Sequence, residues 1–131
     1  MVSATPGKRV QPSRGVRASL LRLAAGLRRA LHSRWTRGLS AAFLVGQMCD
    51  VLTTHVALAS GRFQEANPVF APALETNEAV ALLVKLTLAG LVLLAALTKL
   101  TGTRRTVVLA VLVFISLEAP ATNALRMAGV L

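Results

Sequence analysis

The chain has 131 residues, of which 54% are hydrophobic and 15% are charged, with a mean hydropathy of +0.62. Soluble domains carry about 25% charged residues, so this composition argues against a soluble domain and favours helices that span a membrane. The formal net charge is +10, no acidic residue precedes Asp50, and the single cysteine, Cys49, excludes an internal disulfide.

Residues 1–38 form a basic tail, and its first part, with Pro and Gly among basic residues, is typical of disordered chain. Residues 16–37 are predicted to form an amphipathic helix, because leucines recur at helical spacing along one side. A nucleic-acid-binding arm would also be basic, but aromatic residues do not alternate with the charges and a span follows directly. We therefore expect no nucleic acid partner and predict that the helix contacts anionic lipid headgroups through Arg17, Arg22, Arg28 and Arg29.

Three apolar segments follow, over residues 39–59, 79–97 and 106–125. Each is about as long as the 20 residues needed to cross the hydrocarbon core of a bilayer. Asn67 and Pro68 resemble a helix N-cap followed by a first-turn proline, which predicts a short helix over 68–74 in the first connection. The predicted fold is all-α: residues 39–131 form an integral membrane three-helix bundle, preceded by the basic amphipathic helix.

The flanking charges predict the orientation of the chain in the cytoplasmic (inner) membrane. The tail and the connection between the second and third spans are basic, whereas the first connection carries three glutamates. The positive-inside rule then places the N-terminus in the cytoplasm and the C-terminus outside. A signal-peptidase cleavage after Ala57-Leu58-Ala59 is an alternative, but polar residues such as Asp50 and His55 interrupt the apolar stretch before it.

Each predicted span contains an ionisable residue: Asp50 in the first, Lys85 in the second and Glu118 in the third. From the helical rise, all three lie roughly 9–13 Å from the outer ends of their spans. Charged groups in hydrocarbon need partners, so we expect them to meet between the helices. Their hydrogen bonds are predicted to be completed by Thr53, Thr54 and Asn123.

Two interpretations of this polar cluster remain open. One is a structural lock in a non-enzymatic bundle that acts as a homo-oligomer or as a subunit of a larger complex. The other is a proton-coupled or small-ion carrier, since one cation beside two carboxylates favours keeping one carboxyl protonated. An intramembrane enzyme is the third candidate, but none of the common catalytic motifs is present, and we expect no enzyme activity, no metal and no cofactor.

The segments Asp50-Val-Leu-Thr53-Thr54 and Glu65-Ala66-Asn67-Pro68, with Gly61 between them and Lys85 in the next span, resemble a known pattern. It is that of a family of short bacterial and archaeal membrane proteins, domain of unknown function 5658, and the resemblance covers about residues 43–125. It implies an integral membrane protein of a few helices and supplies no activity, substrate or cofactor. The loop residues that it singles out are Gly61, Glu65, Asn67 and Pro68.

Overall fold

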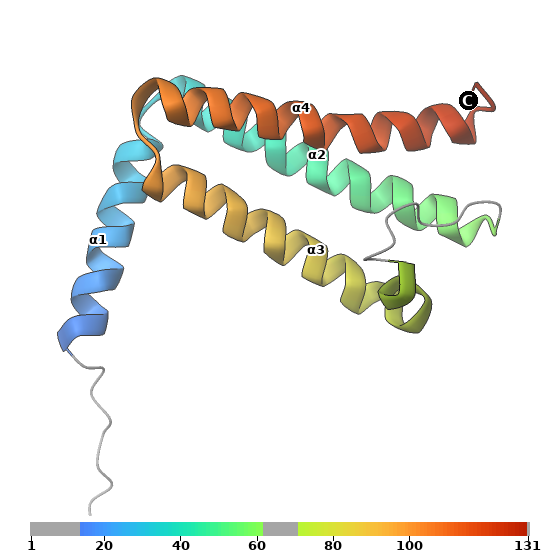
Figure 1. The fold of residues 1–131 in the computed structure, drawn as a ribbon, viewed down its shortest axis with the longest axis horizontal. Coiled ribbons are helices and arrows are strands. Elements are labelled where there is room, and N and C mark those ends of the chain that lie inside the picture. Colours follow the sequence, from blue (N-terminus) through green and yellow to red (C-terminus); the bar gives the residue numbers. More distant parts are fainter. Residues whose placement is uncertain (1–13, 62–70, 131) are drawn as a thin grey trace, which may run out of the picture.

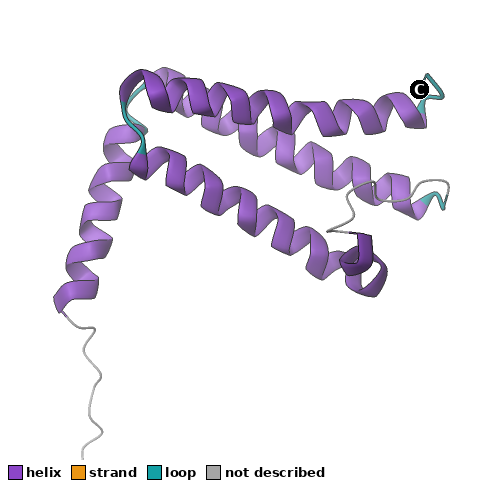
Figure 2. Ribbon diagram, in the orientation of Figure 1, coloured by secondary structure: helices purple, strands orange, loops and turns teal. Residues whose placement is uncertain are grey.

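The computed structural model describes residues 14–61 and 71–130, which form four helices and no strand (Figures 1 and 2). The long helices α2 and α4 run in the same direction, with α3 antiparallel to them, and α1 runs crosswise at one end (Figure 1). We call this the α1 end of the bundle. The predicted all-α fold is confirmed, with helices α1 (Arg14–Ala30), α2 (Arg34–Ala59), α3 (Ala71–Lys99) and α4 (Gly102–Met127).

Helices α2, α3 and α4 are each long and apolar enough to cross a membrane. Most of their large hydrophobic side chains are exposed, including Leu52, Leu83 and Phe114. Such a surface is unfavourable in water but suits hydrocarbon, where lipid tails cover it. The protein is therefore a small multi-pass helical membrane protein whose α2–α4 surface contacts the bilayer.

The amphipathic helix ends earlier than the predicted residue 37. Helix α1 stops at Ala30, and Ser33 begins α2 as its N-cap, with its side chain accepting a hydrogen bond from the Thr36 amide at 3.5 Å. Serine is a preferred residue at this position because its oxygen satisfies an amide that has no helical acceptor. The break turns the chain, so Trp35 and the neighbouring Arg34 belong to the spanning helix α2 rather than to α1.

The apolar core lies at the α1 end of the bundle. Leu109 of α4 and Ala30 of α1 are fully buried there, and they pack with Phe43 of α2. Helix α3 contributes the C-terminal part of its length through Leu93, Ala96 and Leu97. This end is therefore held by contact among all four helices, and α1 is anchored to the bundle by its last turn.

The start of α3 contains a local break at Asn77, whose backbone angles (φ −158°, ψ 96°) are extended. Its side-chain oxygen accepts a hydrogen bond from the Val80 amide at 3.1 Å, so Asn77 caps the spanning part of α3. The predicted short helix over 68–74 begins outside the described residues. Its described part continues from Ala71 up to this break, and the spanning part follows.

Helices α2 and α4 form the most extensive contact in the bundle. A Cβ added to Gly46 would lie 2.5 Å from Ser116 Oγ and 3.0 Å from the Ser116 carbonyl oxygen. Pro120 has no N–H, so that carbonyl, four residues earlier in α4, has no helical donor. Glycine at position 46 lets the α2 backbone approach this part of α4 closely, as small residues do between membrane helices.

We predict that Gly46→Leu destabilises the bundle by about 1–3 kcal/mol, because the added side chain must push α2 away from α4. Thermal unfolding of the purified protein in mild detergent measures the effect. Gly90→Leu is the matched control, since a Cβ at Gly90 meets no atom within 4 Å. Equal unfolding temperatures for the two variants would contradict the close approach of α2 and α4.

Candidate functional site

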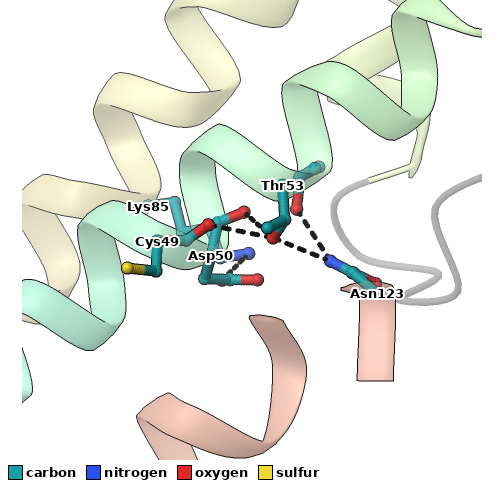
Figure 3. A network of polar contacts seen from close by, with 6 residues as sticks. Cys49, Asp50, Thr53, Lys85 and Asn123 are labelled. Carbon is teal, nitrogen blue, oxygen red and sulfur yellow. Dashed lines mark hydrogen bonds and ion pairs between the residues drawn. The ribbon is translucent and has the colours of Figure 1, made fainter. Parts of the chain in front are cut away.

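An ion pair joins the middle of α2 to the middle of α3. Lys85 Nζ lies 2.5 Å from Asp50 Oδ2, and the two side chains point toward each other between the helices (Figure 3). Asp50 is buried, with 4% of its surface exposed, whereas Lys85 is half-buried. A carboxylate in this environment is costly unless a cation neutralises it, and Lys85 supplies that cation from the neighbouring span.

Asn123 links α4 to the same region of α2. Its amide nitrogen Nδ2 lies 3.4 Å from Thr53 Oγ1 and 3.4 Å from Thr54 Oγ1, to which it donates (Figure 3). Thr53 also donates to its own helix, at 2.9 Å from the Cys49 carbonyl and 3.2 Å from the Asp50 carbonyl. The structure thus brings Asp50, Thr53, Thr54, Lys85 and Asn123 into one polar cluster. It connects α2 to both of the other spans.

The prediction that Glu118 joins this cluster is wrong. Glu118 is exposed on α4, and within the described part of the chain it makes no ion pair or hydrogen bond. The reason is rotational: Glu118 is two residues from Ser116, which is buried against α2, and two residues correspond to about 200° around a helix. Matching depth therefore did not imply a matching face.

A second contact between α2 and α3 was missed by the sequence analysis. His55 Nδ1 lies 2.7 Å from Glu78 Oε1, near the ends of the two helices that the first connection joins. Both side chains are partly exposed, at 59% and 36%. Their position in the sequence could have predicted this contact. Two antiparallel helices bring the residues on either side of their connection to similar heights along the bundle.

The predicted loop motif is only partly described. Gly61 lies just past Ser60, the C-cap of α2, and its φ of +66° is a conformation that favours glycine. Its amide donates to the Leu58 carbonyl at 3.0 Å. Glu65, Asn67 and Pro68 lie outside the described residues. Gly61 therefore ends the first spanning helix, as a C-terminal glycine commonly does.

The cluster holds spans together by matching charge and hydrogen bonds. Lys85 and Asp50 neutralise each other, and Asn123 fills acceptors on two threonines. Among the described residues one carboxylate, not two, is paired with the lysine, so the expected arrangement of Asp50 and Glu118 on either side of Lys85 does not form. Among residues 14–61 and 71–130, no three His, Cys, Asp or Glu side chains come together.

The predicted basic contacts lie along α1. Arg17, Arg22, Arg28 and Arg29 are all exposed, and Arg29 also donates through Nε to the Ala25 carbonyl at 3.3 Å. Their guanidinium groups are therefore on the surface of the helix that crosses the α1 end of the bundle.

We predict that Lys85→Met lowers the stability of the bundle by about 3–5 kcal/mol, because it leaves the buried Asp50 without a partner. Thermal unfolding and the amount of folded protein in the membrane measure the loss. The double variant Asp50→Leu/Lys85→Met removes both charges and should recover most of it. Lys99→Met, at an exposed lysine of α3, is the control. A Lys85→Met variant as stable as this control would contradict a structural role of the Asp50–Lys85 pair.

The chain was also compared with known proteins. Residues 41–119 match the model of a family described as a domain of unknown function, DUF5658. No curated protein and no solved structure matches the chain. The matched range contains Asp50, Lys85 and the contact between Gly46 and Ser116, and it leaves α1 outside. Because the match covers more than half of the chain, this small membrane protein belongs to the DUF5658 family.

Proposed function

We propose that the protein is a non-enzymatic helical bundle that acts in the cytoplasmic membrane as a homo-oligomer or as a subunit of a larger complex. The observation that carries this proposal is the 2.5 Å pair of Lys85 and Asp50. Its charges are used to neutralise each other between two spans, which is a structural role. Glu118, exposed in the third span, adds a group that a neighbouring membrane helix can satisfy.

The carrier alternative loses its specific support. It depended on two carboxylates beside one cation, so that a proton would be held at the cluster. With Glu118 on the outer face of α4, Asp50 is the one carboxylate paired with Lys85 in residues 14–61 and 71–130. A fixed ion pair of this kind favours holding the helices rather than moving a proton between them.

Assembly is tested by co-purification of two differently tagged copies of the full chain, expressed together and extracted from membranes in mild detergent. We expect capture through one tag to recover the second tag, or a fixed set of other membrane proteins. Mixing separately prepared membranes after extraction is the control for aggregation. A product that contains one copy of the chain and nothing else would refute the proposed role.

The charge distribution supports a cytoplasmic location of the α1 end. Exposed basic residues gather there on α1, at the start of α2 and around the connection from α3 to α4. In the first turn of α4, Arg105 donates through Nη2 and Nε to the Leu100 carbonyl in that connection, at 2.5 and 2.9 Å. Positively charged segments of membrane proteins are retained in the cytoplasm, which puts the C-terminus outside.

Helix α1 is suited to lie on the anionic inner surface of the membrane. Its last turns pack on the core through Leu27, Ala30 and Leu31, whereas Leu20 and Leu23, earlier on the same stripe, are exposed. The helix therefore continues beyond the bundle with an apolar side for the acyl boundary. Its exposed arginines can reach phosphate groups at about 1 kcal/mol each.

This placement is tested in the full chain with Cys49→Ser as background. A fluorophore at Leu20→Cys should report an apolar environment in bilayers that contain phosphatidylglycerol, and a more aqueous one after Arg17, Arg22, Arg28 and Arg29 are replaced by Gln. Thr103→Cys should react with a membrane-impermeant thiol reagent in inverted vesicles and remain protected in intact cells. Equal fluorescence in all bilayers, or labelling of Thr103→Cys in intact cells, would contradict the placement.

A further inference from the structure

The surface of α4 that faces away from α2 carries a regular stripe with an acid at its centre. We call it the α4 outer stripe. Its residues are separated alternately by four and three positions, and all are exposed: Val107, Val111, Phe114, Glu118, Ala121 and Leu125. Alternating spacing of four and three is the pattern that lets two helices pack along their length. Phe114, one turn before Glu118, is 74% exposed.

Glu118 makes this stripe unsuitable as a simple lipid contact. It lies nine residues before Met127, the last residue of α4, which is about 13 Å along the helix. A charged side chain at the centre of a span costs about 2.5–3.5 kcal/mol on the insertion scale measured for Asp, Lys and Arg. Within the described residues it has no partner in its own chain, so the cost must be relieved by protonation, by water or by another molecule.

We infer that the α4 outer stripe is the contact surface for a second copy of this chain, in which Glu118 meets Glu118 of that copy. The inference deepens the proposed assembly and rests on it. All copies inserted by the same charge rule have the same orientation, so a two-fold axis along the membrane normal sets each residue at the depth of its counterpart. The stripe is continuous and lies on one helix, so it can pack against itself.

Two carboxyl groups can form a hydrogen bond with each other, which an apolar side chain cannot offer to either of them. A protonated carboxyl donates its O–H, and the opposite carboxyl accepts it. The groups on other elements that bear a charge in the middle of the bundle, Asp50 and Lys85, are paired with each other at the contact of α2 with α3.

The surface is tested by disulfide cross-linking in native membranes, with the full chain in a Cys49→Ser background. Single cysteines replace stripe residues in Val111→Cys, Phe114→Cys and Leu125→Cys. Matched controls replace exposed α4 residues beside the stripe, in Val108→Cys, Ile115→Cys and Leu117→Cys. We expect the stripe positions to form covalent dimers at least several-fold more than the controls. Equal cross-linking all around α4 would overturn the inference.

The role of Glu118 is tested by combining Phe114→Cys with changes at position 118. Glu118→Gln can still both donate and accept and should keep the cross-link, whereas Glu118→Leu should reduce it several-fold. Glu118→Lys should lose self-association but cross-link with a co-expressed copy that keeps Glu118. An unchanged yield in Glu118→Leu would overturn the carboxyl pair; should that variant fail to accumulate in the membrane, the Gln and Lys variants decide.

Failure of this inference and failure of the proposed function give different results. If differently tagged copies co-purify but the stripe cysteines do not cross-link, assembly stands and the α4 outer stripe is not its surface. If the stripe cysteines cross-link only to a protein of different mass, the second-copy assignment is overturned in favour of another subunit. A single-copy product with no cross-link overturns both.

Discussion

The ion pair between Asp50 and Lys85 is the charged contact that joins α2 to α3 between the spans. Lipid tails are as apolar as leucine side chains, so burial of hydrocarbon gives spanning helices little reason to associate in a bilayer. A carboxylate and an ammonium group do favour association, because each charge alone is costly in hydrocarbon whereas the pair is neutral. At 2.5 Å from Asp50, Lys85 fixes the level of α3 against α2 as well as its face.

Different contacts hold the helices together at different places along the bundle. At the α1 end, buried side chains from all four helices pack around Leu109 and Phe43, so α3 is held there by shape. Farther along, its ion pairs with α2 among the described residues are Asp50 with Lys85 and, nearer the connection, His55 with Glu78. Helices α2 and α4 are held by the close approach of their backbones at Gly46 and Ser116. The hydrogen bonds of Asn123 add to this contact.

The acidic residues Asp50 and Glu118 lie in different surroundings on their spans. Asp50 is buried and neutralised within its own chain, whereas Glu118 is exposed on α4. The first sets the internal arrangement and the second marks the outer surface of α4 as a place where another polar group is needed. A bundle of three spans has little interior, so a further ionisable group such as Glu118 faces outward, where we propose that it joins chains rather than helices.

The sequence by itself determined the class of protein, its three spans, the basic amphipathic helix before them and the residues that need partners in a membrane. These follow from local quantities: hydropathy, length and the cost of a charge in hydrocarbon. It also indicated the level of Asp50 and Lys85, because the helical rise is fixed. Only the tertiary structure decided which faces meet. Rotation of α4 is set by the fit of Ser116 against Gly46. This contact joins residues far apart in the sequence and has no periodic signal, and it turns Glu118 away from the cluster. Ser33 and Asn77 are residue types preferred as N-caps, so at these two breaks the structure decided only which local candidate begins each helix.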